Sequence, residues 1–486
     1  MAGNPALLLK RLLEESAERS WLEFKVDNCD PDMVGRTVSA CANAAMLEEK
    51  HKAYIIWGIE NKTKKRVGTN VVLADLQKGG ENFVNWLSRM IEPRLQLEHL
   101  DFQHEGKSFA ILAIEPSYDK PVRFSGSEYI RIGENVKPLK EYPNHERSLW
   151  FATGRRTFEN AIALGHQSKE EILDKLQCEQ FYKLRGEPTP DNADEIIRCF
   201  VQKEFIKEDM EGGYDVLNLG ALLFAKDLPQ FPSIASKSVR IVKYQGKDKR
   251  RSEEEQEGKL GYAVGFTGML KYISARLPKE ELYEGGVRKT KSKYPDLAIR
   301  EVVANALIHQ DFTIPGVGPI VEIYEDRIEV TNPGKSLIER DRIIDERRSR
   351  NERLASIMRE LGICEERGSG IDKAIIEIEE NKLPAPHFIA SSHSMRVVIF
   401  GPRDLAKMSK QDRVWSCFCH CVVRWLQHDY MSNNSLRERF SLKDEEYQIA
   451  SAVIADAKKA KRIIPADPDQ GKRNAKYIPY WGRLEE

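Results

Sequence analysis

The stretch EVVANALIHQDF, which begins at Glu301, constrains the fold of this chain more than any other segment. At helical spacing, Glu301, Asn305 and His309 form one narrow polar line, and apolar residues flank that line on both sides. A helix at a protein surface normally collects its polar residues on a wide face. A carboxylate, an amide and an imidazole in a narrow line on so apolar a helix therefore indicate a chemical role.

A carboxylate and an amide one helical turn apart can share a hydrated Mg²⁺, with Asn305 as a ligand and Glu301 orienting or deprotonating a water. Such a site needs phosphates nearby, and two later loops offer contacts to them. A strand hairpin ends in the turn Asn332-Pro333-Gly334, and Gly368, Ser369 and Gly370 come directly before an apolar-periodic helix. Glycines there allow backbone N–H groups to approach a phosphate, although such a loop is often an ordinary helix cap.

Composition limits the class of protein. The 486 residues suffice for about three to four domains. Lys plus Arg and Asp plus Glu number 76 each, so a basic surface for nucleic acid must be local. The chain has no apolar run long enough to span a membrane, and MAGNPALLLKRLLEESAERS predicts an amphipathic helix rather than a secretion signal. Eight cysteines without a regular framework fit a reducing compartment, so we expect a cytoplasmic protein.

Helix and strand patterns divide the chain into four parts. Residues 1–150 mix both signals and predict an α/β or α+β domain, 151–235 read as helical, and 236–402 form a second α/β domain. Residues 403–486 predict three helices and a basic hairpin, the order of a winged helix, which can contact DNA or RNA. A protein-contact or dimerisation module of the same shape is the alternative. The local basic patch comprises Lys458, Lys459, Lys461, Arg462, Lys472, Arg473 and Lys476.

Two polar segments have simple structural interpretations. CFCHC (Cys417, Cys419, His420, Cys421) lies at helical spacing among apolar residues and favours a core helix over a metal site. The charge run KDKRRSEEEQEGK favours a solvated hairpin tip or loop over a docking surface.

Carboxylates also gather near the N-terminus. Glu18 and Glu23 bracket RSWL, and Glu60 follows the strand AYIIWGI. If the three converge, they could hold one or two divalent cations for phosphodiester hydrolysis, with Lys25 close enough to touch phosphate. The alternative is three solvated glutamates on the surface of a chain whose charged fraction is 31%.

The runs REVVANALIHQDF, DRIEVTNPG, RNERLAS and ERGSGIDK together resemble the GHKL ATPase fold of the gyrase, heat-shock-ninety, histidine-kinase and mismatch-repair group. They look most like the divergent form that follows a Schlafen-type, Alba-like domain in bacterial ATP-binding proteins. ERSWLEFK, CANAAMLEEKHKAYIIWGIEN and KPVRFSGSEYIRIG fit that N-terminal domain. The resemblance covers residues 8–400 and implies a multidomain α/β and α+β chain: a Schlafen/Alba-like domain, a GHKL-like α/β sandwich and a C-terminal winged helix.

The GHKL resemblance implies roles for the second α/β domain. Glu301 would activate water, Asn305 would ligate Mg²⁺ and His309 would complete the same edge. The turn Asn332 to Gly334 would line ATP, and Gly368, Ser369 and Gly370 would cradle phosphate. Arg350 and Asn351 would lie on the lid. The aspartate that normally reads the adenine amino group is absent from the NPG turn, which leaves adenine preference and hydrolysis open.

The Schlafen resemblance implies a catalytic role for the N-terminal carboxylates. In Schlafen ribonucleases an E-x4-E pair and an acidic residue after the next strand form the active site, and Glu18 and Glu23 match the pair. Glu60 or Asn61 stands where aspartate is usual, and AAMLEEKHKA replaces the usual Asn-Thr-Gly-Gly turn. The resemblance thus implies a nuclease using Mg²⁺ or Mn²⁺, with altered geometry.

Three hypotheses follow. The first is an ATP-controlled endonuclease that acts on structured RNA such as tRNA in defence or stress. The second is an ATP-responsive DNA-binding regulator without nuclease activity, and the third is an ATP-dependent assembly protein. Each would bind ATP, and the GHKL resemblance implies a homo-oligomer.

Overall fold

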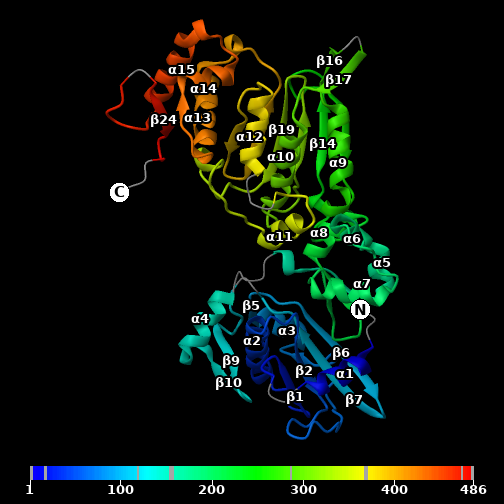
Figure 1. Ribbon diagram of the computed structural model, residues 1–486. Coiled ribbons are helices and arrows are strands. Elements are labelled where there is room, and N and C mark those ends of the chain that lie inside the picture. Colours follow the sequence, from blue (N-terminus) through cyan, green and yellow to red (C-terminus); the bar gives the residue numbers. More distant parts are fainter. Residues whose placement is uncertain are drawn as a thin grey trace. The chain divides into compact units, whose positions relative to one another are not determined.

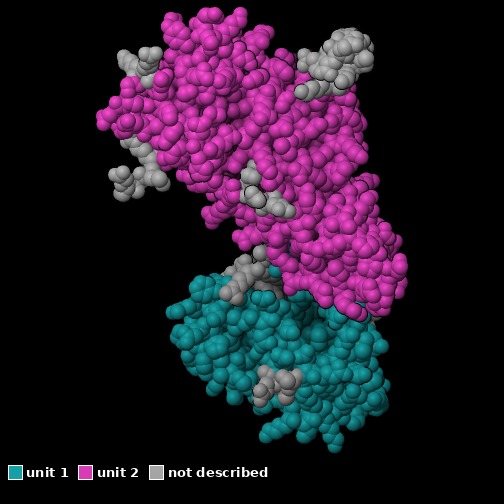
Figure 2. Space-filling view, viewed as in Figure 1, with its two compact units in different colours: residues 1–168, 207–215 teal, residues 169–206, 216–486 magenta. Residues whose placement is uncertain are grey.

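A computed structural model describes residues 4–15, 19–117, 120–152, 158–284, 287–365, 370–471 and 474–482. The chain forms two compact units (Figure 2). Unit 1 comprises residues 1–168 and 207–215, and unit 2 comprises residues 169–206 and 216–486. None of the described helices is both long and apolar enough to cross a membrane.

Unit 1 contains two four-stranded sheets (Figure 1). The first has the order β1 (Leu22–Lys25), β2 (Ala53–Trp57), β7 (Lys107–Ile114) and β6 (Leu97–His104), with β1 and β2 parallel and the other pairs antiparallel. The second has the order β10 (Asn135–Pro138), β9 (Ser127–Ile132), β8 (Arg123–Phe124) and β5 (Ile91–Glu92). Unit 1 also includes α1 (Pro5–Glu14), β3 (Gln77–Lys78), β4 (Glu81–Asn82), α3 (Phe83–Met90), α4 (Pro143–Ala152) and β11 (Ile162–Gln167).

Helix α2 (Pro31–Leu47) packs against β2 of the first sheet and against β8 and β9 of the second. Its small residues permit this burial: a Cβ on Gly35 would lie only 2.2 Å from the Phe124 ring. The buried Asn43 amide accepts from Val122 N at 2.7 Å and donates to Val122 O and Tyr129 O at 2.8 Å each. A polar side chain with all these partners is stable in a core and fixes the register of helix and strands.

Unit 2 is built on a six-stranded sheet. Its order is β15 (Ser252–Glu257), β14 (Arg240–Tyr244), β18 (Ile320–Ile323), β19 (Arg327–Pro333), β21 (Ser394–Phe400) and β20 (His387–Ala390), and only β14 and β18 are parallel neighbours. Helix α10 (Asp296–Ile308) packs against β19 and lies between α9 (Tyr262–Arg276) and α12 (Gly370–Glu380) (Figure 1). Unit 2 also contains α5 (Lys169–Lys175), α6 (Glu179–Arg185), α7 (Ala193–Gln202), α8 (Asn218–Phe224), β16 (Lys279–Glu284), β17 (Val287–Ser292) and α11 (Glu352–Glu360). The strands β12 (Ile206–Glu208) and β13 (Tyr214–Leu217) each have residues assigned to both units.

Residues 410–482 form what we call the C-terminal module. It contains α13 (Lys410–Leu426), α14 (Asn433–Phe440) and α15 (Tyr447–Lys459), with a small sheet of β22 (Met431–Ser432), β24 (Lys476–Pro479) and β23 (Ile463–Pro465). Ser409 and Ser432 cap α13 and α14 with reciprocal side-chain bonds. The three predicted helices and the hairpin strands are therefore present.

The core interpretation of the cysteine cluster is confirmed. Cys417, Cys419 and Cys421 are fully buried, and burial raises the pKa of each thiol above its usual range. His420 lies between Glu379 and Ser435, with Nδ1 2.9 Å from a Glu379 oxygen and Nε2 3.1 Å from Ser435 Oγ. The cluster therefore belongs to the core of the module, as its helical spacing indicated.

Two secondary-structure predictions need correction. The segment KAYIIWGIENKTKKRVGTN (52–70) predicts two strands joined by a polar turn, whereas the structure forms β2 followed by the isolated bridge Ile59–Arg66. The polar segment between them turns tightly, with Lys64 N donating to Glu60 O at 2.8 Å. The predicted helical region 151–235 also holds the strands β11, β12 and β13. The charge run forms a turn followed by the mostly exposed edge strand β15.

Candidate functional site

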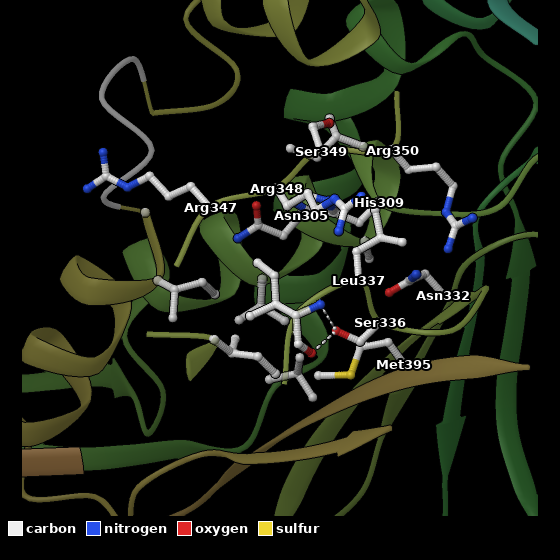
Figure 3. Close-up of a pocket in the computed structure, with 18 of the residues that line it drawn as sticks. Asn305, His309, Asn332, Ser336, Leu337, Arg347, Arg348, Ser349, Arg350 and Met395 are labelled. Carbon is white, nitrogen blue, oxygen red and sulfur yellow. Dashed lines mark hydrogen bonds between the residues drawn. The ribbon is translucent and has the colours of Figure 1, made fainter. Parts of the chain in front are cut away.

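A cavity of about 380 Å³ lies beside α10 in unit 2 (Figure 3). Its volume is within the range of small-molecule sites, about 300–1,000 Å³. The apolar part of its wall comes from the sheet and includes Val330, Phe388, Met395 and Val397. Most of its polar side chains come from α10 and from residues 334–350, which we call the arginine loop. The lining of the cavity thus combines apolar side chains with polar and charged ones.

The polar line of α10 faces this cavity, as its spacing suggested, because Glu301, Asn305 and His309 all line it. Glu301 is only 2% exposed, and burial raises the pKa of its carboxyl. The Arg300 guanidinium, whose Nη1 is 2.6 Å from Glu301 Oε1, opposes that rise. A buried carboxyl with a raised pKa is suited to accepting a proton from water.

His309 ends α10, and its N–H donates to Asn305 O at 3.0 Å. Burial lowers the pKa of its imidazole to about 4, and the nearby Arg350 charge acts in the same direction. The ring is therefore neutral at pH 7 and offers one donor and one acceptor to the cavity.

The arginine loop makes the cavity positive. Five cationic side chains line it against three carboxylates, a balance that favours an anionic ligand. The cations are Lys335, Arg347, Arg348, Arg350 and Arg359. Arg350 holds the loop in place, with Nη1 3.0 Å from Asp311 Oδ2 and Nη2 donating to Lys335 O at 2.8 Å. Within the described part of the chain, the buried Ser349 Oγ and Arg350 Nε have no hydrogen-bond partner.

Two glycines bring backbone close to this site. Gly334 has φ +105°, and a Cβ there would lie 2.7 Å from Asp311 Cβ. A Cβ on Gly370 would lie 2.3 Å from Glu301 Oε2, so the start of α12 approaches the α10 carboxylate directly. Side chains at either position would force the surrounding segments apart.

The structure brings together at the cavity seven of the residues that sequence reasoning selected in the second α/β domain: Glu301, Asn305, His309, Asn332, Gly334, Arg350 and Gly370. Asn332 is buried in the wall, and its Nδ2 donates to Pro333 O at 3.2 Å. Asn351 does not line the cavity; its Nδ2 donates to Ile308 O at 2.8 Å and to Gln310 O at 2.9 Å. Gly368 and Ser369 lie outside the described residues. Sequence reasoning missed Lys335, Arg347 and Arg348, although the run ERRSRN was a visible signal.

The N-terminal carboxylates lie in unit 1. Glu23 and Lys25 are on β1, and Glu23 is gripped by two cations: Oε2 is 2.8 Å from Arg131 Nη1, and Oε1 is 3.3 Å from Lys25 Nζ. Sequence analysis did not select Arg131, whose side chain is 2% exposed, as a residue of this site. Glu60 is exposed and accepts a hydrogen bond from Thr63.

Glu18, the other member of the predicted pair, lies outside the described residues. Among the residues that the structure describes, no group of three or more His, Cys, Asp or Glu side chains could hold a metal ion. Both Glu23 oxygens are occupied by cations, so Glu23 as placed here does not fit a metal ligand.

Comparisons with known proteins found one family model that matches part of unit 1 and another that matches part of unit 2. Residues 18–140 match the family model "Schlafen, AlbA_2", and residues 316–399 match "Putative ATP-dependent DNA helicase recG C-terminal", a HATPase_c_4 model. No curated protein matches the chain. Among solved structures, the DIP2311 protein from Corynebacterium diphtheriae matches 98% of this chain and 96% of its own, at 16% identity and a TM-score of 0.42. The chain therefore combines a Schlafen-type AlbA_2 domain with a GHKL-like ATPase-type domain of the HATPase_c_4 kind.

Proposed function

We propose that this protein binds ATP in the cavity of unit 2 and that the nucleotide controls an activity directed at nucleic acid. The observation that carries the first part is the lining of the cavity, which combines apolar side chains of the sheet with five cationic side chains. An apolar wall suits a base, and the arginine loop suits a polyphosphate. The match of residues 316–399 to an ATPase-type family model supports the same assignment.

The residues that line the cavity have different roles in this proposal. The arginine loop would bind the phosphates, mainly through Arg348. Asn305, one helical turn from Glu301 on α10, would hold the accompanying Mg²⁺. ATP supplies the phosphoanhydride bond, while Glu301 orients a water and accepts its proton. Neutral His309 can hydrogen-bond to a phosphate or ribose without adding charge. Gly368 and Ser369 remain proposed phosphate contacts.

Calorimetric titration with ATP and Mg²⁺ tests the binding. Arg348→Ala should weaken ATP affinity about tenfold or more, because it removes a charge-assisted contact. Lys271→Ala is the matched control: Lys271 is an exposed cation on α9 of the same unit and does not line the cavity. Absence of ATP binding by the unmodified protein would reject the proposal.

For the nucleic-acid activity, we propose first a metal-dependent endonuclease acting on structured RNA, as in the Schlafen resemblance. The charged cluster of Glu23, Lys25 and Arg131 supports it, because these two largely buried cations would pair with a phosphodiester if Glu23 moved away from them. In this reading Glu18 and Glu60 would hold the metal ion, and Glu23 would release a cation to the phosphate when substrate binds.

Cleavage of total tRNA and of single- and double-stranded DNA, with Mg²⁺ or Mn²⁺ and with or without ATP, tests the endonuclease. Glu18→Ala should abolish cleavage, because it removes a proposed metal ligand. Glu134→Gln, an exposed carboxylate of unit 1, should leave it intact. If the unmodified protein cleaves nothing while it binds ATP, the regulator becomes the preferred function.

One observation favours that second function, an ATP-responsive winged-helix regulator. Lys458, Lys459 and Lys461 are exposed at the end of α15, near the strand that carries Lys476. The start of α15 is acidic, with Asp444 and Glu445 exposed, so phosphate contacts would run through the C-terminal half and the hairpin. A DNA affinity that falls steeply with salt, and more weakly in Lys458→Ala/Lys459→Ala, would support it.

A further inference from the structure

The C-terminal module and the cavity share one hydrophobic core. Ile344 and Phe388 are buried in the core cluster that contains Trp415, Phe418 and Val422 of α13. The same two residues line the cavity. Ile343, Ile371, Met395 and Val397 also both line the cavity and pack against that cluster. One side of this apolar layer therefore faces the proposed nucleotide, and the other side is the interior of the module.

An ion pair and two cation–π contacts also hold the arginine loop against the module. Asp341, in the short 3-10 helix Arg340–Arg342, forms an ion pair with Arg462 at the end of α15. Arg340 lies over the Trp415 ring at 4.3 Å, and Arg342 lies over the Trp481 ring at 4.2 Å. A few residues further on, the same loop presents Arg347 and Arg348 to the cavity (Figure 3). The middle of the loop thus contacts the module, and the residues on both sides of it line the ligand site.

Helix α12 makes a second connection. Its first residue, Gly370, touches the Glu301 carboxylate, and its last turn carries Glu379. Glu379 is clamped by the module: Oε2 is 2.9 Å from His420 Nδ1, and Oε1 is 3.2 Å from Arg439 Nε. These three side chains are at most 11% exposed, so their charges interact in a poorly solvated region. Both ends of one rigid helix are therefore engaged, one at the ligand site and one in the module.

We propose that the C-terminal module regulates the nucleotide cavity, and is regulated by it, through the arginine loop and α12. A nucleotide that orders the arginine loop stabilises the docked module, and the docked module holds the loop in the arrangement that binds nucleotide. Because coupling between two sites is reciprocal, a nucleic acid that binds the docked module more tightly than the undocked module must also tighten nucleotide binding. This inference depends on the ATP site proposed above.

Nucleotide titrations of full-length variants test the coupling. Arg462→Ala and Asp341→Asn each remove the ion pair from one side, and each should weaken binding of ATP with Mg²⁺ about fivefold or more. The double variant should lose no more than either single variant, because the two residues act through one contact. Lys410→Ala is the matched control, since it removes a module cation whose ion-pair partner, Asp456, lies in the module itself.

Hydrogen exchange on the unmodified protein gives a readout that does not depend on how any variant folds. ATP with Mg²⁺ should slow exchange in α13–α15, and Arg462→Ala should lose that protection. If the unmodified protein binds ATP while exchange in the module is unchanged and Arg462→Ala binds equally well, the coupling is wrong and the ATP site stands. If the unmodified protein binds no ATP, both proposals fall.

Discussion

Burial and a neighbouring charge shift the pKa of the Glu301 carboxyl in opposite directions. The carboxyl is almost fully enclosed, which raises its pKa, while Arg300 lies 2.6 Å away and favours the charged form. Burial thus favours the neutral carboxylic acid, and the Arg300 charge favours the carboxylate. That balance is suited to a base that acts on one water rather than to a simple surface charge.

Glu301→Gln should separate binding from turnover. The amide keeps the shape of the side chain and removes a negative charge near the phosphates, so ATP should bind at least as tightly as before. ATP hydrolysis should fall about 100-fold or more, because the proton acceptor is lost. Titration and ADP release measure the two effects, with Glu325→Gln, an exposed carboxylate outside the cavity, as the control. Unchanged turnover in Glu301→Gln would exclude the proposed role.

His309 should make stability depend on pH. Its pKa falls from 6.5 to about 4 on folding, so between these values the unfolded chain binds more protons than the folded one. The free energy of unfolding should therefore decrease as pH falls from about 6.5 to 4, by about 2 kcal/mol from this group. Urea unfolding at pH 7 and pH 4.5 should show a smaller decrease for His309→Gln. His428→Gln, an exposed histidine, should behave as the unmodified protein does.

At the scale of elements, the end of α10 depends on a side chain from a distant segment. Asn351 is buried, and its amide donates to two main-chain carbonyls, those of Ile308 and Gln310. Since the last carbonyls of a helix have no partner within it, such a side chain completes the helix and fixes the turn that follows. Sequence analysis assigned Asn351 to the nucleotide lid, and the structure gives it this supporting position instead.

Asn351→Ala should destabilise the protein by about 2 kcal/mol, because buried carbonyls lose their donors. Asn351→Asp should cost more, since it turns a donor into an acceptor that faces the same oxygens. Asn381→Ala, which removes a comparable bond from an exposed amide to Glu377 O, should cost well under 1 kcal/mol. Chemical unfolding measures all three, and equal effects of the Ala and Asp changes at position 351 would contradict this account.

At the scale of the whole molecule, the two compact units have separate cores, so unfolding is not expected to be a single two-state step. Scanning calorimetry should resolve two transitions, and ATP at a hundredfold excess over its dissociation constant should stabilise only the one from unit 2, by about 2.7 kcal/mol. Gly35→Ala, which forces a Cβ against Phe124, should lower only the other transition. A shift of both transitions by ATP would contradict this assignment.

Local patterns in the sequence determined much of this protein. The spacing of Glu301, Asn305 and His309 placed them on one line, the serines before α13 and α14 capped those helices, and the apolar setting of CFCHC marked a core. Each of these depends on residues a few positions apart, whose relative geometry follows from the period of a helix. The matched family models bear out the two resemblances that such motifs suggested.

Only the tertiary structure decided which distant side chains meet. Arg131 reaches Glu23 across 108 positions of sequence, and Arg462 reaches Asp341 across 121, and no periodicity relates either pair. The same holds for the apolar layer that serves at once as cavity wall and as module core. Contacts of this kind arise from the packing of whole elements, which depends on the sum of many weak interactions rather than on any local motif.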